Sequence, residues 1–174
     1  GLLGSEYYAE NPLYPLATTV AVLNMDALSP WGPTRDFSIS GSAKLELLDS
    51  LVADAKAWDR RYTPDARPEA GSFFRSDHFP FAKRGVPAVS FDSGEDWVEG
   101  GVAAGKAATE QYLKDRYHQP ADEWDEKWPF TGLQRDLELL HKVGADLANS
   151  DQWPEWAPDT EFRAARDASA TERN

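Results

Sequence analysis

Short apolar runs alternate with longer amphipathic segments along this chain, and that alternation most constrains its fold. The runs 18–24 (TTVAVLN) and 86–91 (VPAVSF) are almost continuously apolar, as expected of strands that are covered on both faces. Residues 36–40 (DFSIS) alternate between polar and apolar side chains and predict a further strand. Strands that alternate with helices indicate the α/β class, here with a mixed, mostly parallel sheet flanked by helices.

Helices are expected before, between and after these strands. Gly4 and Ser5 begin a short helix, which Asn11 and Pro12 end. Three longer helices are expected at 42–58, 102–116 and 130–149. The first would be capped by Ser42, and the last places Leu133, Leu137, Leu140, Val143, Gly144 and Leu147 at helical spacing.

The remaining segments are predicted to be connections and a tail. Residues 25–35 form a loop marked by two prolines and a glycine, and the segment 62–71 is a proline-rich connection. Residues 151–174 are rich in tryptophan, proline and charge, which predicts a peripheral wrap that frays after Phe162. The expected organisation is one domain over 1–162 followed by a frayed tail, 163–174.

Composition excludes several classes of function. The net charge of −12 excludes nucleic acid as an expected partner and argues against docking on an anionic membrane. No stretch approaches the length of a membrane span. Because the chain has no cysteine, it has no disulfides, thiolate zinc ligands or cysteine nucleophile.

Candidate chemistry is sought where buried strands end, because sites in α/β sheets form at the carboxyl ends of strands. Asp26 follows the first apolar run and leads into the proline-rich loop, so it is placed where a metal ligand could sit. The alternative is a turn aspartate that bonds its own backbone.

Two of the three histidines lie in predicted loops among aromatic residues. His78 follows Ser76 and Asp77, while His118 lies four residues before Asp122. Neutral imidazole binds zinc, and a carboxylate on the other ring nitrogen would fix its tautomer, a part that Asp122 could play. The alternative for each histidine is ordinary hydrogen bonding within a loop. His141 lies inside the last predicted helix and is expected to be exposed or half-buried.

A serine hydrolase is a weaker interpretation. The Gly-x-Ser-x-Gly pattern does not occur, and the adjacent residues Ser76, Asp77 and His78 cannot converge as a triad. An esterase that pairs Ser76 or Ser93 with His78 or His118 stays open as a low-ranking alternative.

Four stretches in order carry a resemblance to a known family: GLLGSEYY, VAVLNMD, FFRSDHFPFAKRGVPAVSF and YHQPADEWD. They are similar to the C-terminal half of the co-catalytic di-zinc aminopeptidases. The group also includes glutamate carboxypeptidases and glutaminyl cyclases. The resemblance implies a partial α/β/α sandwich, a peptide or amino-acid-derivative substrate, and two zinc ions in the complete site. The tail NSDQWPEWAPDTEF resembles exported bacterial members, which implies a periplasmic or extracellular parent protein.

The resemblance also implies residue roles. Asp26 matches a terminal carboxylate ligand of one zinc ion, and His118 matches an imidazole ligand of the other. Residues beside the substrate pocket or behind the ligands are implied at Phe73, Phe74, Arg75, Ser76, Asp77, His78, Tyr117 and Asp122. In the family, a Glu-Glu pair directly precedes the Gly-Leu-Leu-Gly-Ser segment. Its first member is the general base and its second a zinc ligand, while a histidine and a bridging aspartate lie further upstream.

None of those four upstream residues is in this sequence, so two of five ligands and no general base are expected here. The expected function is that of the C-terminal portion of an aminopeptidase-type exopeptidase that is inactive or weakly active alone. The alternative is a non-catalytic fragment that binds peptides or associates with itself. Self-association through exposed sheet edges would make homo-oligomers.

Overall fold

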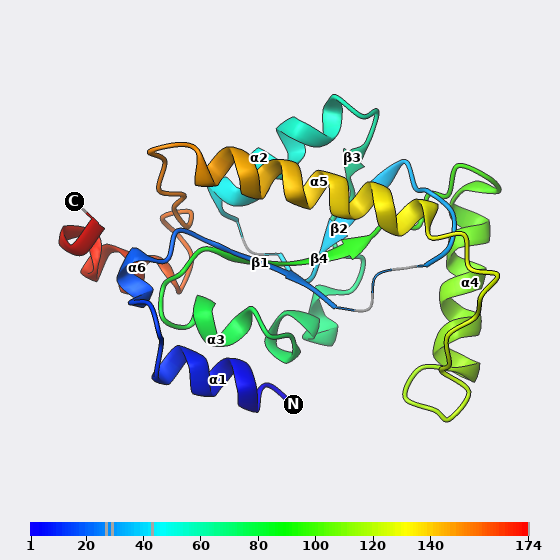
Figure 1. The fold of residues 1–174 in the computed structure, drawn as a ribbon, viewed down its shortest axis with the longest axis horizontal. Helices are drawn as coiled ribbons and strands as arrows, with labels where there is room; N and C mark the ends of the chain where they lie inside the picture. The colour runs from blue at the N-terminus through cyan, green and yellow to red at the C-terminus, as the bar shows by residue number, and fades with distance from the viewer. Residues whose placement is uncertain (27, 29, 43, 174) are drawn as a thin grey trace.

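The protein is built on a four-stranded sheet, seen in the computed structural model, which describes residues 1–26, 28, 30–42 and 44–173 (Figure 1). The strands are β1 (Val22–Met25), β2 (Asp36–Ile39), β3 (Arg61–Tyr62) and β4 (Ala88–Ser93), in the order β1-β4-β2-β3. β1 runs parallel to β4 and β2 parallel to β3, whereas β2 and β4 are antiparallel. The predicted mixed sheet flanked by helices is confirmed.

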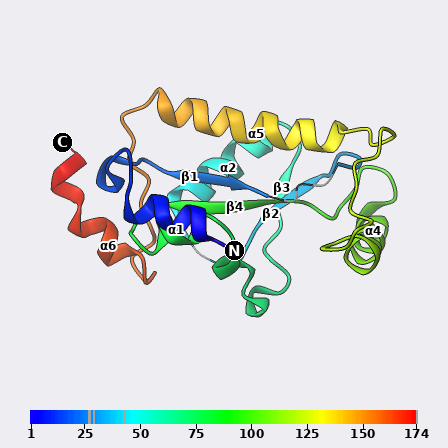
Figure 2. The ribbon, with the colours of Figure 1, turned by 60° about the horizontal axis from the view of Figure 1, so that its bottom comes forward.

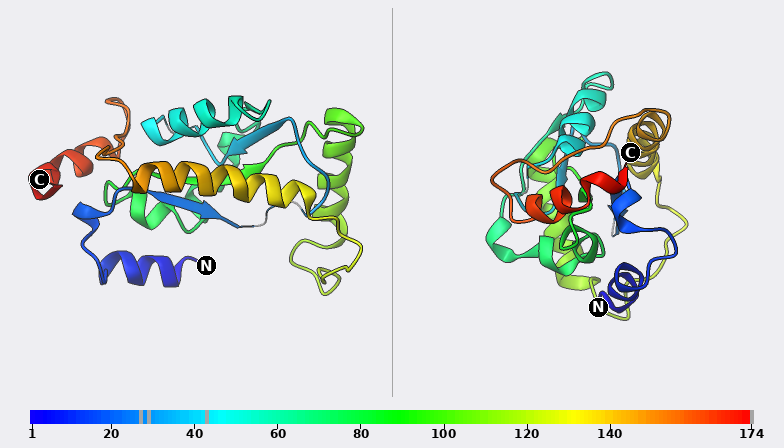
Figure 3. Two further views of the ribbon diagram at one scale, coloured as in Figure 1. Left: turned by 45° about the horizontal axis from the view of Figure 1, so that its top comes forward. Right: turned by 90° about the vertical axis from the view of Figure 1, so that its left-hand side faces the viewer.

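Helices lie on both faces of the sheet. They are α1 (Leu3–Glu10), α2 (Glu46–Lys56), α3 (Phe79–Ala82), α4 (Gly101–Asp115), α5 (Thr131–Ala148) and α6 (Arg163–Ala168). Figures 2 and 3 show α2 and α5 on one face of the sheet, with α1 and α3 on the other. α4 stands beyond the end of the sheet toward which β1 and β4 point, and α6 lies at the opposite end (Figure 1).

The core lies between the sheet and the helices α2 and α5. Phe37 of β2 and Phe91 of β4 stack with ring centroids 5.4 Å apart, and both are fully buried. Leu51 of α2 and Leu139 of α5 close over this layer with no exposed surface. Burial of each such side chain contributes about 1.5–3 kcal/mol, so this face of the sheet fixes the positions of the strand ends.

The first strand differs from its prediction in start and in burial. It begins at Val22, because a 3₁₀ turn, Leu16–Thr18, takes up the first residue of the predicted run, and residues 19–21 belong to neither helix nor strand. Its residues are half-buried or exposed, whereas those of β4 are buried as far as Phe91. The sheet order explains the difference, since β1 is an edge strand and β4 is central.

The helix predicted from Ser42 begins later, at Glu46, with Leu45 in the N-cap position. The residues before it pair instead with the C-terminal tail. The Glu46 amide donates to the carbonyl of Glu155 (3.0 Å), and the Ala157 amide donates to the carbonyl of Lys44 (2.9 Å). This non-local pairing holds the chain extended where the sequence predicts the first helical turn.

One strand was not predicted. β3 has only two residues, Arg61 and Tyr62, and lies at the start of the predicted proline-rich connection. It is held by the Arg61 amide, which donates to the carbonyl of Arg35, and by the Thr63 amide, which donates to the carbonyl of Phe37. Within the predicted loop 25–35, Ala27 and Ser29 lie outside the described residues, as does Ala43 in the predicted helix.

The segment predicted to fray after Phe162 forms α6 in the structure. Its Arg166 side chain is 1% exposed, and the guanidinium donates to the carbonyls of Thr19 (3.1 Å) and Val20 (3.3 Å). An arginine inside a polar tail is ordinarily assigned to solvent, and its carbonyl partners near residue 20 give no sequence signal.

Of the described helices, none combines the length and the apolar character needed to cross a bilayer.

Candidate functional site

The carboxyl ends of β1 and β4 lie side by side at one end of the sheet, because the two strands are parallel neighbours (Figure 1). Asp26 directly follows β1 and is exposed. Asp92 is the fifth residue of β4. In α/β sheets, ligands bind at the carboxyl ends of the strands. The sequence predicts Asp26 at this place, and the strand order agrees with it.

A cluster of three polar side chains connects the strands near their carboxyl ends. The Asn24 amide donates to the hydroxyl of Ser76 (2.9 Å) and that of Ser90 (3.3 Å), and the two hydroxyl oxygens are 3.0 Å apart. Ser76 and Ser90 are buried. The cluster joins β1, β4 and the loop before α3, so it fixes the point at which Asp26 leaves the strand.

Asp77 connects two of the four stretches that carry the resemblance. The Ser5 hydroxyl in α1 donates to its carboxylate over 2.6 Å. Glu6 adds ion pairs with Lys83 (3.0 Å) and Arg84 (3.1 Å), both of which follow α3. Asp77 therefore positions α1 beside α3.

His78 is fully buried, and its ring meets Phe73 edge-on with centroids 4.6 Å apart. Neither ring nitrogen has a hydrogen-bond partner among the described residues. Burial in these surroundings lowers the pKa of His78 to about 4, so the imidazole is neutral at physiological pH.

The aromatic residues before this motif are divided between core and surface. Phe73 is buried and stacks on Phe162, with centroids 5.6 Å apart, whereas Phe74 is 52% exposed. Both line a surface pocket of about 250 Å³. The Arg75 guanidinium donates to the carbonyl of Ala70 (3.0 Å).

His118 lies in the loop after α4 in a left-handed backbone conformation (φ 58°), and its ring stacks on Tyr117 with centroids 3.9 Å apart. The Asp122 carboxylate accepts a hydrogen bond from the Tyr112 hydroxyl over 2.9 Å. Over the described part of the chain, His118 forms no hydrogen bond or ion pair with either Asp26 or Asp122. The loop leaves α4 at the far end of the helix from its start at Gly101 (Figures 1 and 3).

Asp92, near the carboxyl end of β4, has a carboxyl group with a raised pKa. Its side chain is exposed to solvent and lines a pocket at the carboxyl end of β4. Desolvation raises the pKa of Asp92 to about 6, and the nearby carboxylates of Asp65 and Asp26 add to the rise. The Ser40 hydroxyl donates to it over 2.9 Å and acts in the opposite direction. The sequence places Asp92 at a strand end but gives no signal of these neighbours.

The described residues contain no group of three histidine, aspartate or glutamate side chains that could hold a metal ion. A catalytic zinc ion needs about three protein ligands and a water. The described residues of this chain therefore do not by themselves fit a catalytic zinc ion.

Comparison of the sequence with models of protein families shows the family to which this chain belongs. The sequence model of peptidase family M28 matches residues 1–141. The chain belongs to peptidase family M28. This is a zinc-dependent family of the co-catalytic aminopeptidase and carboxypeptidase type, so the predicted family is confirmed. Searches of curated proteins and of solved structures gave no match.

The M28 match includes β1, β4 and the residues at their carboxyl ends, and it ends within α5, at His141. Both predicted metal ligands, Asp26 and His118, lie inside it. The tail after residue 141 lies outside it, although Trp156 is buried in the core and its indole donates to the carbonyl of Gly85 (3.0 Å).

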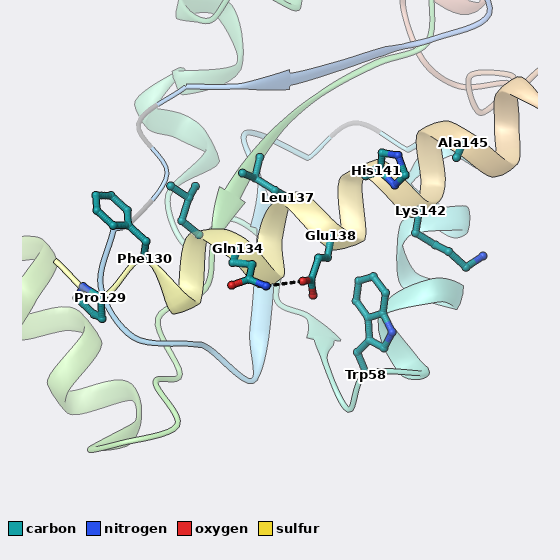
Figure 4. Close-up of a pocket in the computed structure, with 10 residues that line it drawn as sticks. Trp58, Pro129, Phe130, Gln134, Leu137, Glu138, His141, Lys142 and Ala145 are labelled. Atoms are coloured by element: carbon teal, nitrogen blue, oxygen red, sulfur yellow. Dashed lines mark hydrogen bonds between the residues drawn. The ribbon is translucent and has the colours of Figure 1, made fainter.

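A groove lies along α5 (Figure 4). It has a volume of about 740 Å³ and runs from Phe130 past Leu137 and His141 to Ala145, with Trp58 on its other side. Leu137 is 43% exposed, although the predicted helix placed it on the apolar face. α5 meets the sheet through Leu140 and its neighbours instead, so Leu137 borders the groove. His141 is exposed, as predicted.

Proposed function

We propose that this chain is part of an aminopeptidase-type exopeptidase that removes single residues from peptides with the help of two zinc ions. The observation that carries this proposal is the match of residues 1–141 to peptidase family M28. Asp26 and His118 would each contribute one ligand, and residues outside this sequence would complete the metal centre and supply the general base.

The decisive experiment compares the polypeptide encoded by the complete gene with this chain alone, using a leucine-containing peptide as substrate. The longer polypeptide is expected to release leucine and to lose activity to a chelator, with recovery on adding zinc. Asp26→Asn and His118→Gln should each lower activity by more than about 100-fold, beyond the usual effect of changes behind the ligands. Asp151→Asn, at an exposed position in the tail, is the matched control. Activity that survives both ligand variants would refute the assignment.

A non-catalytic peptide-binding module is the second candidate, and the incomplete ligand set favours it. Calorimetric titration of this chain with zinc separates the two candidates. Weak binding that Asp26→Asn or His118→Gln abolishes supports a partial centre. Zinc binding that neither variant changes supports the module. Tight binding of two ions per chain would contradict both candidates, since this chain would then hold a complete centre.

The serine esterase receives no support from the geometry. The Ser76 hydroxyl is buried against Ser90 and Asn24, and the Ser93 hydroxyl donates to Asp136 over 2.5 Å. Export of the parent protein stays a proposal that rests on the resemblance of its tail.

A further inference from the structure

A pocket of about 490 Å³ lies between the carboxyl end of β4, the start of α5 and α4. It begins two residues beyond Asp26, at Leu28, and it includes Asp122, four residues beyond His118. The pocket therefore adjoins both chain segments that carry the predicted metal ligands. The residues that line it are Leu28, Pro30, Trp31, Asp92, Ser93, Gly94, Glu95, Trp97, Thr109, Tyr112, Asp122, Trp128, Phe130 and Leu133.

The chemistry of this lining is uneven. Five side chains are aromatic and three are carboxylates, but no lysine, arginine or histidine occurs among the described residues that line the pocket. The faces of aromatic rings carry partial negative charge and attract cations, and carboxylates add further negative charge. Such a wall suits a positively charged organic group and disfavours an anion.

Ring contacts and a hydrogen bond hold the aromatic walls of the pocket in place. The Trp31 ring lies 6.0 Å from that of Trp97 and meets Tyr112 edge-on at 5.9 Å. The Tyr112 hydroxyl bonds Asp122, which fixes one carboxylate at the wall. A Cβ on Gly132 would lie 2.5 Å from the Trp31 carbonyl oxygen, so only glycine lets α5 start this close to Trp31. The site is preformed, which lowers the entropic cost of binding.

A cation already contacts one of these rings. The Arg116 guanidinium lies 5.8 Å from the centroid of the Trp128 ring. Arg116 lines a neighbouring depression that shares Trp31, Tyr112 and Trp128 with the pocket. The Asp92 carboxylate, which accepts a hydrogen bond from the Ser40 hydroxyl over 2.9 Å, also lines the pocket.

We propose that this pocket binds the side chain of a lysine or arginine residue of a peptide. A bare metal ion does not suit it, because aromatic rings are poor ligands and the described residues offer no three-ligand group. A small ammonium ion would leave most of the volume unfilled. A basic side chain places its alkyl stem along Leu28, Pro30 and Leu133 and its charge among the rings and carboxylates. The identification of this residue as part of a peptidase substrate rests on the proposed function.

The test measures binding to this chain without added metal and without turnover. The probes are Nα-acetyl-lysine methylamide and Nα-acetyl-norleucine methylamide, which have the same stem with and without the charge. Titration is followed by tryptophan fluorescence, since three tryptophans line the pocket. The lysine probe is expected to bind at least about tenfold more tightly, as cation–π and carboxylate contacts of ordinary strength imply. Equal binding of both probes would overturn the proposal.

Variants locate the binding site. Trp31→Leu and Asp122→Asn should each weaken binding of the lysine probe by about tenfold or more, whereas the norleucine probe should change little with Asp122→Asn. The controls are Trp124→Leu, at a position 70% exposed in the same loop and outside the pocket, and Asp151→Asn. If Trp31→Leu fails to fold, Tyr112→Phe replaces it: this variant keeps the ring but removes the hydroxyl that holds the Asp122 carboxylate, so it should also weaken binding of the lysine probe. Lysine binding that no pocket variant alters would refute the proposal.

The outcomes separate this inference from the proposed function. If this chain binds the lysine probe selectively but the complete gene product cleaves no peptide, the proposed peptidase function is refuted and the basic side-chain pocket stands. A chelator-sensitive peptidase that cleaves leucine and lysine substrates equally, without selective probe binding, would do the reverse.

Discussion

At the scale of single residues, His78 is the side chain with the clearest dependence on pH. The folded protein keeps its imidazole neutral down to a pH of about 4, whereas an unfolded histidine takes up a proton near pH 6.5. Between these values the unfolded state binds the extra proton, so the free energy of unfolding should fall as the pH is lowered. The difference between the two pKa values corresponds to roughly 3 kcal/mol for this fully buried ring.

Urea denaturation at pH 7, 5 and 4 measures this loss. Carboxylates also titrate in this range, so the informative quantity is the difference between wild type and His78→Phe, which cannot titrate. The variant should lose less stability than wild type between pH 7 and 4, whatever its stability at neutral pH. His141→Phe, at an exposed position, should keep the wild-type slope. An unchanged slope in His78→Phe would show that another group causes the loss.

The same residue shows where sequence reasoning stops. A histidine in Ser-Asp-His among aromatics indicates either a ligand or a loop hydrogen bond, whereas neither ring nitrogen of His78 has a hydrogen-bond partner among the described residues. The position of Asp26 at the carboxyl end of β1 could be predicted from one rule, since a residue that directly follows a strand lies at the carboxyl end of that strand. Asp92 could not be singled out, because its raised pKa depends first on desolvation by the surrounding fold and then on the charge of Asp65.

At the scale of elements, a buried ion pair joins the chain before β3 to α5. Arg60 and Asp136 lie 2.6 Å apart with side chains 1% and 3% exposed, and Ser93 also donates to the carboxylate. Removing one partner leaves the other charge buried, at a cost of about 3–5 kcal/mol. We expect this loss for Arg60→Met and for Asp136→Leu separately.

A double-mutant cycle tests the coupling. The double variant Arg60→Met/Asp136→Leu should lose much less than the sum of the two single losses in urea denaturation, because no unpaired charge is left. Arg61→Met is the control, since Arg61 is 56% exposed in its pair with Asp96 and should cost under about 1 kcal/mol. Simple additivity would mean that the two side chains do not stabilise each other.

The C-terminal helix gives a second prediction about an element. Burial lowers the pKa of Arg166 to about 10 but leaves it charged at neutral pH, and it bonds two backbone carbonyls before β1. Hydrogen bonds to a charged group contribute about 1.5–3 kcal/mol. Arg166→Met should therefore lower the free energy of unfolding by roughly 2–4 kcal/mol, and Arg67→Met, in an exposed position, should change it little. No loss in Arg166→Met would support the frayed tail predicted from the sequence.

Elements formed by local pattern could be predicted, and those formed by distant contacts could not. The leucine spacing of α5 and the apolar run of β4 determine those elements. β3 and the late start of α2 depend instead on backbone partners near residues 35 and 155, which no local window contains. The aromatic pocket has the same origin, because its lining comes from separate segments between Leu28 and Leu133.

At the scale of the whole molecule, β1 leaves one edge of the sheet without a strand partner among the described residues. Its end is apolar, with Met25 45% exposed. Exposed edge strands pair with other chains, whereas the net charge of −12 on each copy opposes such pairing. Salt screens the repulsion and leaves the backbone hydrogen bonds of an edge largely intact, so association should increase with ionic strength.

Sedimentation velocity at low and high salt and at several protein concentrations tests this balance. The wild-type chain is expected to form dimers or larger species at high concentration, and more so at high salt. Met25→Lys places a charge on the free edge, a common protection of edge strands, and should keep the chain monomeric. Leu113→Lys makes the same charge change at an equally exposed position on α4, 45%, and should associate as wild type does. If both variants stay monomeric, the added charge rather than the edge prevents association. If the wild type is monomeric throughout, the free edge of β1 does not recruit a second copy.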